Sequence, residues 1–363
     1  MKIFFIDWNN MTPQYTFPLI DSFNNKKDVE PYFISNTQNK DKELSSYYNF
    51  NCINIFFSNK HKFFKPIILF FNYCLLLYKI FKIKPVIIQY NWLSIPAIDY
   101  IFIKLFKILD ITVFLTQHNY VQHHKKYLRF GENLIFKNVD VIICLSSFVK
   151  NQFSHSYQKK IFIIPHSNCY EKILKPIKKN FNQTISFLLI GNIQKYKGIE
   201  FLIDVMHFLK LKNYKIHLNI YGSGEKDYID SLNKKIIYLN LENMISITNQ
   251  FSSFDNLCYQ ISRCDIGLLP YKKASQSGLP YLYAYYKKPM IINNVGGLVE
   301  QSCSSFCNIS EYNVESFSSS IINMLDKIKN NSIKNSEFEK FLLSNSWDKC
   351  INKYFLKYLK YEN

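Results

Sequence analysis

The sequence predicts an α/β fold made of two doubly wound, parallel-sheet domains that face each other across a cleft. Short apolar and β-branched runs alternate with helix-length segments along the whole chain, and continuous runs of this kind are typical of strands covered on both faces. Each run is followed by a segment long enough to form a crossover helix. The 363 residues are sufficient for two domains of ordinary size.

Seven strands are expected in the first half of the chain and five in the second. The first seven are predicted at 2–7, 29–35, 52–57, 86–90, 112–117, 140–146 and 160–165. The other five are predicted at 186–191, 215–222, 245–251, 265–271 and 289–294. The polar segment 168–184 restarts the alternation, so it is interpreted as the linker between domains 1–170 and 171–345. The last segment, 346–363, has the pattern of one amphipathic helix without a strand partner, which we expect to dock on one of the domains.

Composition favours a folded chain with reduced thiols. Hydrophobic residues make up 48% of the sequence, and its nine cysteines include no CxxC pair, which favours a cytoplasmic location over a disulfide or zinc framework. The first ten residues lack the pattern of a signal peptide. The most apolar stretch, Pro66 to Tyr78, has thirteen residues, whereas crossing a bilayer takes about 20. It is therefore expected to form a buried or interfacial helix.

The net charge of +18 is concentrated in the first half of the chain. Residues 1–180 hold 24 Lys and Arg against 11 Asp and Glu, and residues 181–363 hold 21 against 16. A basic half suits anionic lipid, nucleic acid or a phosphorylated substrate. Only Arg129 and Arg263 are arginines, and base readout depends on arginine, so a membrane surface is favoured over nucleic acid. A background bias towards lysine explains the same charge.

Two joints between a predicted strand and the following helix combine small residues with polar groups. At GNIQKYKG, 191–198, Gly191 permits a tight turn and Gly198 a close backbone approach, with Lys195 and Lys197 beside any bound phosphate. A glycine-containing turn is common after any such strand, as at YGSG, 221–224.

The second joint is SQSGLP, 275–280. Ser277 is expected to be the N-cap, with Pro280 in the first turn and the amides of Gly278 and Leu279 free for an anion. A purely structural cap explains Ser277 equally well. Together, the two joints predict a site for a ligand that carries a diphosphate.

The histidines and the search for catalytic motifs limit the possible site residues and reaction types. His118 ends the predicted strand 112–117, on the side where ligands of parallel sheets bind. A lone histidine is more often structural, and His166 either faces the cleft or packs near the linker. His123 and His124 are expected to lie in a solvent-facing loop. The sequence contains no HExxH, GxSxG or Walker A motif and no paired Cys/His pattern for a metal.

Taken together, the order and spacing of several segments resemble glycosyltransferase family 4, the retaining enzymes with the GT-B fold, and especially their bacterial surface-polysaccharide branch. The segments are TQHN, DVIICLS, IPHSN, GNIQKYKG, YGSG, CDIGLLPY and SQSGLPYLYAYYKKPMIINNVGGLVE. The resemblance covers nearly the whole chain. It implies a nucleoside-diphosphate sugar bound mainly by the second domain, an acceptor bound by the first, no metal and no other cofactor. It also implies that the C-terminal helix crosses back to the first domain.

The resemblance implies roles for individual residues. His118 and Lys197 would take part in catalysis. The donor would be bound by Gly191, Asn192, Lys195, Lys197, Gly198, Asn249, Ser275, Gln276, Ser277, Gly278, Leu279 and Glu300. The acceptor would be bound by Asn10, Tyr15, Trp92 and Asn119.

The chain departs from the family pattern at several positions. The N-terminal glycine pair that often approaches the phosphate is absent, and WNNMTPQYT occupies that loop. Asn192 stands where many members have arginine, and the two family glutamates fall on Ser275 and Tyr283. Ser275, Gln276 and Ser277 are expected to supply neutral hydrogen bonds instead.

The expected reaction is transfer of a hexosyl group, with retention, from a nucleoside-diphosphate sugar to a glycan or polyprenyl-diphosphate-linked acceptor. It would serve surface polysaccharide synthesis, such as capsule or lipopolysaccharide, in the cytoplasm or peripherally on the inner face of the cytoplasmic membrane. Nucleic acid is not an expected partner. Two alternatives stay open: a GT-B sugar-nucleotide epimerase, which needs no acceptor, and a catalytically inactive sugar-nucleotide-binding module.

Overall fold

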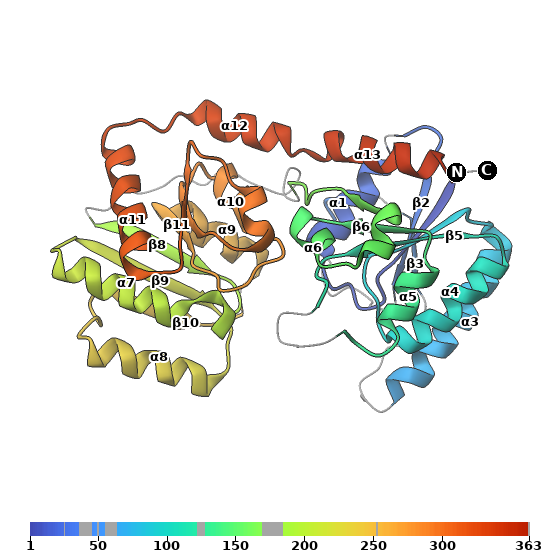
Figure 1. Ribbon diagram of the computed structural model, residues 1–363, viewed down its shortest axis with the longest axis horizontal. Helices are drawn as coiled ribbons and strands as arrows, with labels where there is room; N and C mark the ends of the chain where they lie inside the picture. Colours follow the sequence, from blue (N-terminus) through green and yellow to red (C-terminus); the bar gives the residue numbers. More distant parts are fainter. Residues whose placement is uncertain are drawn as a thin grey trace. The chain divides into compact units, whose positions relative to one another are not determined.

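The computed structural model divides into two compact units (Figure 1). Unit 1 comprises Met1–Ile173 and Asn345–Asn363, and unit 2 comprises Leu174–Ser344. The structure describes residues 1–24, 26–35, 46–48, 51–54, 64–121, 128–168, 184–251 and 253–361. Predicted residues 55–57, the histidine pair at 123 and 124, and most of the linker lie outside the described residues.

Unit 1 is built on a seven-stranded parallel sheet in the order β3-β2-β1-β4-β5-β6-β7. Its strands are β1 (Lys2–Ile6), β2 (Glu30–Ser35), β3 (Asn51–Asn54), β4 (Ile87–Tyr90), β5 (Thr112–Gln117), β6 (Val141–Cys144) and β7 (Ile161–Ile163). Its described α-helices are α1 (Pro13–Phe23), α3 (Lys65–Ile83), α4 (Pro96–Ile108), α5 (Glu132–Asn138), α6 (Ser147–Asn151) and α13 (Trp347–Leu359). A 3₁₀ helix, η2 (His155–Lys160), precedes β7.

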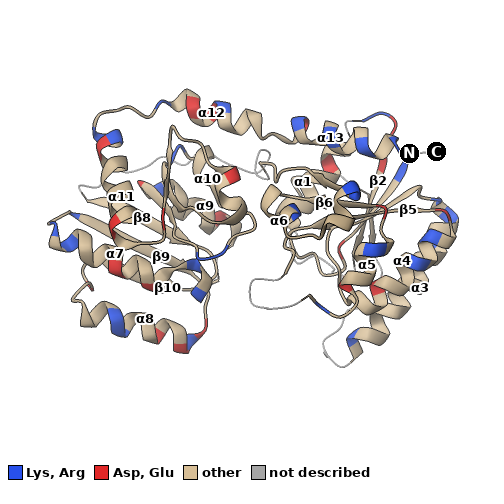
Figure 2. Cartoon of the chain, in the orientation of Figure 1, with Lys and Arg blue, Asp and Glu red and all other residues tan. Residues whose placement is uncertain are grey.

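Unit 2 is built on a six-stranded parallel sheet in the order β10-β9-β8-β11-β12-β13. Its strands are β8 (Ile185–Ile190), β9 (Ile216–Gly222), β10 (Ile245–Asn249), β11 (Ile266–Leu269), β12 (Met290–Asn293) and β13 (Cys307–Ser310). Its α-helices are α7 (Ile199–Leu211), α8 (Lys226–Tyr238), α9 (Phe254–Arg263), α10 (Leu279–Tyr285), α11 (Val314–Lys329) and α12 (Asn335–Ser344), with 3₁₀ helices η3 (Lys195–Lys197) and η4 (Gly296–Gln301). Lysines and acidic residues are mixed over α7 and α8 (Figure 2).

The cores follow from the apolar runs in the sequence. In unit 1, central-strand residues such as Ile88 and Leu115 pack with Tyr73 of α3 and Phe102 of α4. In unit 2, β8 and β9 pack against α7 and α11 in the same way. Burial on both faces explains the continuous apolar run of strands such as β8. In β9, by contrast, His217 and Asn219 alternate with buried apolar residues.

The predicted fold class is confirmed: both sheets are parallel, and the C-terminal helix returns to unit 1. There α13 packs on α1, with the Phe23 and Tyr358 rings stacked 5.3 Å apart. The prediction of five strands in the second half is wrong, because β13 forms a sixth. The expected thirteen-residue apolar helix is also wrong in length, because α3 has 19 residues.

Candidate functional site

In unit 2, backbone hydrogen bonds hold the loop 191–198 against the chain at the end of β9. The Gly191 amide donates to the Tyr221 carbonyl at 3.0 Å, and Ile193 forms a parallel bridge with Gly224. Gly198 has a φ of +72°, and a Cβ there would lie 1.9 Å from the Pro270 carbonyl oxygen. Glycine at 198 therefore allows the loop to pass close to the chain after β11, which places the start of α7 at the strand ends.

Lys197 is the charged residue of this loop that the fold buries. Its Nζ donates to the Tyr271 hydroxyl at 2.7 Å and lies 3.9 Å from the centroid of that ring. Burial lowers the pKa of Lys197, although interaction with Tyr196 acts in the opposite direction. A cation held between tyrosines beside Gly191 is positioned in advance for an anionic ligand.

The loop Ser275–Leu279 follows β11 and carries neutral polar groups. Ser275 is buried, and the Leu279 amide donates to the Ser277 Oγ at 3.2 Å. The N-cap of α10 is Gly278, not Ser277 as predicted. The prediction of a free Leu279 amide is also wrong, because this amide donates to the hydroxyl of Ser277, the residue before the N-cap.

Gln301 holds this loop in place, and the sequence analysis did not find it. Its Oε1 accepts from the Ser277 amide at 2.7 Å, and its Nε2 donates to the Ser277 carbonyl at 2.8 Å. The Gly297 amide also donates to the Ala274 carbonyl. The available sequence signal was a glutamine directly after the GGLVE motif. A glutamine side chain has one acceptor and one donor group, so it can bond both the amide and the carbonyl of a backbone segment.

Tyr283 occupies one of the two positions where the family carries glutamate. Its side chain is fully buried, and its hydroxyl donates to the Leu188 carbonyl of β8 at 3.1 Å. A Cβ at Gly267 of β11 would lie 2.5 Å from the Tyr283 ring. Tyr283 thus packs against the central strands β8 and β11, and Gly267 leaves room for its ring.

The other predicted donor residues surround these loops. Asn192, Lys195 and Glu300 are exposed, and Gln276 is half-buried. Asn249 ends β10, and its Oδ1 accepts from the Gly224 amide at 3.1 Å. The loops after β8, β11 and β12 and the last residue of β10 therefore all contribute predicted residues to the carboxyl ends of the unit 2 strands. Their contacts with a donor stay predictions.

In unit 1, four of the five residues predicted for catalysis or the acceptor follow strand ends, and the fifth lies on α1. His118 follows β5, and its ring is stacked on Trp92 at 4.4 Å with an interplanar angle of 9°. Tyr15 of α1 stands edge-on to His118 at 5.1 Å, and its hydroxyl is hydrogen-bonded to that of Tyr354 in α13. The C-terminal helix thus supports the histidine through Tyr15. Contact of Tyr15 with an acceptor stays a prediction.

His118 is buried in a largely apolar environment. Burial, and to a lesser extent the neighbouring His166 ring, lowers the pKa of His118 to about 3, and the Asn91 backbone only partly opposes this. Within the described ranges, neither ring nitrogen has a hydrogen-bond partner of normal geometry. The imidazole is therefore neutral at physiological pH, with one donor and one acceptor nitrogen available for a polar ligand.

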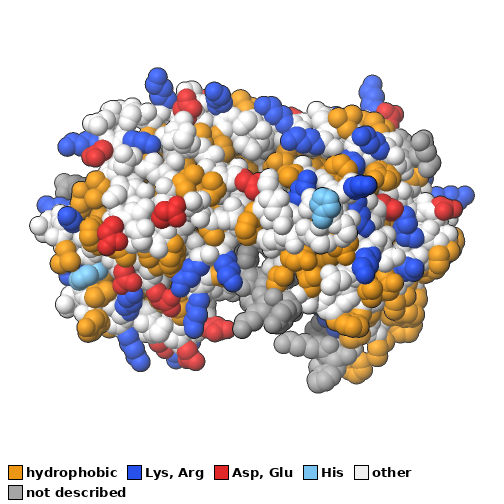
Figure 3. Space-filling model, in the orientation of Figure 1, with side chains coloured by type: hydrophobic (Ala, Val, Ile, Leu, Met, Phe, Trp, Pro, Cys, Tyr) orange, Lys and Arg blue, Asp and Glu red, His pale blue; other side chains and the backbone are white. Residues whose placement is uncertain are grey.

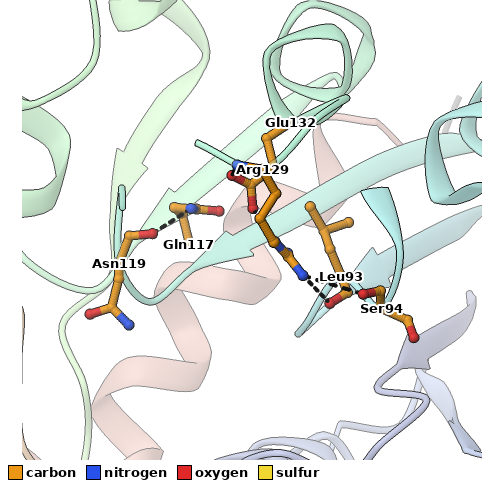
Figure 4. Close-up of polar contacts among 6 residues, drawn as sticks. All are labelled: Leu93, Ser94, Gln117, Asn119, Arg129 and Glu132. Atoms are coloured by element: carbon orange, nitrogen blue, oxygen red, sulfur yellow. Dashed lines mark hydrogen bonds and ion pairs between the residues drawn. The ribbon is translucent and has the colours of Figure 1, made fainter. Parts of the chain in front are cut away.

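Figure 4 shows polar contacts of Gln117 and Asn119, which flank His118 in the sequence, and of Arg129. Arg129, which the sequence analysis did not assign to the site, pairs with Glu132 at 2.7 Å and donates to the carbonyls of Leu93 and Ser94. These contacts fix the loop that carries Trp92. The Gln117 side chain donates to the Asn119 carbonyl, and the Asn119 side chain points away from Gln117 (Figure 4).

The remaining predicted acceptor residue, Asn10, is almost buried in the loop after β1, with a φ of +46°. The Trp92 Nε1 donates to the Thr12 hydroxyl of the same loop at 2.8 Å. Loops after β1, β4 and β5 thus meet at one edge of unit 1. Among the residues that the structure describes, no three His, Cys, Asp or Glu side chains are grouped closely enough to hold a metal ion.

Comparisons with known proteins show which proteins these two units resemble. Residues 171–338 match the family model for glycosyl transferases group 1. An uncharacterised glycosyltransferase of Methanocaldococcus jannaschii is 23% identical over 218 residues, which cover 59% of this chain and 58% of that protein. An uncharacterised glycosyltransferase of Bacillus subtilis is 24% identical over 144 residues, which cover 40% of this chain and 39% of that protein. The chain thus matches only about half the length of these curated relatives.

Solved structures share the fold over nearly the entire chain. A glycosyltransferase from Rickettsia africae ESF-5 has a TM-score of 0.75 at 17% identity, covering 99% of this chain and 98% of that one. Anabaena HepE in complex with UDP has a TM-score of 0.72 at 14% identity, covering 99% and 100%. The second half of the chain thus matches the group 1 glycosyl transferases, and nearly the whole chain has the GT-B fold of these solved structures, which confirms the expected family resemblance.

Proposed function

We propose that this protein transfers a hexosyl group, with retention, from a nucleoside-diphosphate sugar to a hydroxyl of a glycan or polyprenyl-diphosphate-linked acceptor. The observation that carries the proposal is Lys197, a buried cation held by Tyr271 at the strand ends of unit 2. A lysine in this setting suits a diphosphate because the surrounding protein screens its charge less than water does.

The chemistry assigned to unit 2 is stabilisation of the leaving group. Breaking the bond between the sugar and the diphosphate builds negative charge on the diphosphate oxygens. Lys197, Lys195 and the polar loop 275–279 are assigned to that charge, and the departing oxygen accepts the acceptor hydroxyl proton. The positions of the two family glutamates hold Ser275 and Tyr283, so the donor hydroxyls are assigned neutral hydrogen bonds from the loop. The UDP bound by Anabaena HepE supports a nucleoside diphosphate as the first ligand to test.

The chemistry assigned to unit 1 is orientation. A neutral His118 ring, stacked on Trp92, hydrogen-bonds a sugar hydroxyl without bringing a positive charge near the developing oxocarbenium ion. Asn10 and Asn119 are assigned to acceptor hydroxyls. A glycan on a lipid carrier would place the protein in the cytoplasm or on the inner face of the cytoplasmic membrane, and the excess of lysine over acidic residues in the first half supports this location.

Product analysis with a panel of nucleoside-diphosphate sugars tests the proposal. The purified protein is incubated with each donor, with and without saccharide acceptors, and released nucleoside diphosphate and new sugars are quantified. Transfer to an added acceptor is the expected result. An altered sugar nucleotide formed without acceptor would support an epimerase instead. Donor binding without any product, across the panel, would indicate a non-catalytic module.

Donor binding is measured separately by thermal shift, because a ligand that binds the native state raises the melting temperature. Lys197→Met should remove the shift produced by the preferred donor. Lys212→Met, which removes an exposed lysine beyond α7, is the matched control and should retain it. An unchanged shift in Lys197→Met would overturn the phosphate assignment.

A further inference from the structure

The outward face of α3 is apolar along the length of the helix. Leu69, Tyr73, Leu76 and Ile80 on its inner face belong to the core of unit 1. The opposite face exposes a series of large apolar side chains at helical spacing, namely Ile67, Phe70, Phe71, Leu75, Tyr78 and Phe81. Surface helices of globular proteins normally turn charged or polar residues outward. An apolar outer face therefore indicates contact with something other than water.

The large apolar area continues onto the neighbouring helix. The ring of Phe70 in α3 lies 5.6 Å from that of Phe102 in α4, and α4 adds the exposed side chains of Ile101 and Ile108. Figure 3 shows hydrophobic side chains gathered at the lower right, where Figure 1 places α3 and α4. We name this area, formed by the exposed apolar residues of α3 and α4, the α3–α4 face.

Length and composition alone would allow α3 to cross a membrane, with a mean hydropathy of 1.6. Its packing argues against a crossing. Tyr73 is stacked on Phe102 at 4.1 Å, and its hydroxyl donates to the buried Asp99. Extracting the helix into a bilayer would dismantle this core. An orientation parallel to the membrane plane keeps the core intact and buries only the outer face.

The charges at the edge of the α3–α4 face decide between a lipid surface and another apolar partner. The sequence of α3 contains no acidic residue. Lys82 lies on its outward face, Lys65 at its start, and Lys104 is exposed on α4. The one acidic residue of α4, Asp99, is fully buried. Apolar side chains accompanied by these three lysines match a bilayer that carries anionic headgroups, because lysine reaches the headgroups while the aromatic rings enter the acyl boundary.

We propose that the α3–α4 face is a docking surface for an anionic lipid bilayer. The role of this surface rests on the proposed function, because docking on the bilayer would bring the protein to a lipid-linked acceptor. Binding to the bilayer itself depends only on unit 1. Phe71, with an exposed fraction of 54%, and Tyr78, with 62%, are the central side chains to insert.

Vesicle flotation with the full chain tests the docking surface. Vesicles of phosphatidylcholine alone are compared with vesicles that contain one third phosphatidylglycerol. The wild-type protein should float with the anionic vesicles, and Phe71→Ser/Tyr78→Ser should reduce the bound-to-free ratio at least tenfold. The matched control, Ile237→Ser/Tyr238→Ser, removes two exposed apolar side chains from α8 in unit 2 and should bind as the wild type does.

Charge and self-association are tested with the same proteins. Lys65→Glu/Lys82→Glu should lose binding to anionic vesicles, and the wild type should bind neutral vesicles at least tenfold more weakly. Equal binding to both kinds of vesicle would overturn the anionic specificity. Sedimentation tests whether a second copy of the chain covers the α3–α4 face instead. If the wild type is a dimer, Phe71→Ser/Tyr78→Ser is a monomer and neither protein floats with vesicles, the proposal is overturned in favour of a dimer interface.

A donor thermal shift keeps this inference separate from the proposed function. Phe71→Ser/Tyr78→Ser should retain the wild-type shift, which also shows that the variant is folded. Flotation without any donor binding would leave the docking surface supported and the proposed reaction overturned. Donor binding and transfer to a soluble acceptor, without flotation, would overturn the docking surface alone.

Discussion

At the ends of its strands, unit 2 presents a buried lysine and amide-containing loops, whereas unit 1 presents a neutral histidine between aromatic rings. Lys197 in unit 2 is held by a tyrosine hydroxyl. His118 in unit 1 is stacked on Trp92 and supported by Tyr15. The strand ends of the two units share a parallel-sheet architecture but differ in charge. Those of unit 2 carry a cation that suits an anion, and those of unit 1 carry a neutral ring that suits an uncharged, hydroxyl-rich ligand.

The comparison shows that the net charge of a region does not predict the charge of the groups at its strand ends. The first half of the chain carries the larger share of the +18 charge. Its strand ends nevertheless hold groups that burial drives towards their neutral forms, such as His118 and Asp7. The lysines of α3 and α4 lie instead beside the exposed apolar side chains of the α3–α4 face. Local burial and contacts therefore decide the chemistry of each edge.

Restoring a family glutamate at Tyr283 should break unit 2. The side chain is fully buried, and its hydroxyl is bonded to a strand carbonyl, so Tyr283→Glu would place an uncompensated carboxylate in the core. We expect a loss of about 3–5 kcal/mol in the free energy of unfolding, measured by urea denaturation.

Tyr283→Phe is the control for this experiment, since it removes only the hydrogen bond to Leu188 and should cost about 1 kcal/mol. A Tyr283→Glu variant as stable as the wild type, with faster transfer, would mean that this position faces the donor. Tyr283 would then belong to the site rather than to the core.

Removing the cation should be the most damaging change to catalysis that leaves the fold intact. Lys197→Met keeps the length of the buried side chain and removes its charge, so transfer is expected to slow by about 10²–10³-fold. Lys195→Met, at an exposed position, should have a smaller effect because water screens its charge. Equal losses from the two changes, measured as kcat/KM, would contradict the assignment of the buried lysine as the main stabilising group.

The sequence predicted both sheets and the central residues of each edge, but missed features formed by distant contacts. Gln301 acts through the backbone of Ser277, and Arg129 through carbonyls of the loop after β4. Neither residue lies in the predicted motifs. Each forms hydrogen bonds with backbone groups, and every residue type has these groups, so the sequence of the bonded segment gives no sign of the contact. Strand β13 was missed because CNIS alternates polar and apolar residues at a sheet edge, unlike the continuous runs of the central strands.

Gln301 offers a smaller effect that is specific to the loop Ser275–Leu279. Gln301→Leu removes both hydrogen bonds to Ser277 and should loosen the loop Ser275–Leu279 without removing a charge. We expect about a tenfold rise in KM for the donor, equivalent to about 1.4 kcal/mol, with a smaller change in kcat. Gln260→Leu on α9 is a matched control and should leave KM unchanged. A fall in kcat alone would place Gln301 in the chemical step instead of in loop positioning.

The pH dependence of unfolding tests the neutral character of unit 1. Burial lowers the pKa of His118 to about 3 and that of His166 to about 4. The unfolded histidines bind protons below about pH 6.5 that the native ones do not, so they reduce stability as the pH falls. Burial raises the pKa of Asp7 and of Asp99 to about 7. These native carboxyls hold protons that the unfolded chain releases above about pH 4, so they increase stability as the pH falls.

Because two groups act in each direction, the wild-type free energy of unfolding should change little between about pH 4.5 and 6.5, where each group contributes about 1.4 kcal/mol per pH unit. His118→Asn removes one histidine, so its stability should rise as the pH falls. Asp99→Asn removes one carboxyl, so its stability should fall over the same range. Urea unfolding at several pH values measures all three slopes. Parallel slopes would show that these groups are solvated in the native state, and the contrast between a neutral and a cationic edge would then fail for unit 1.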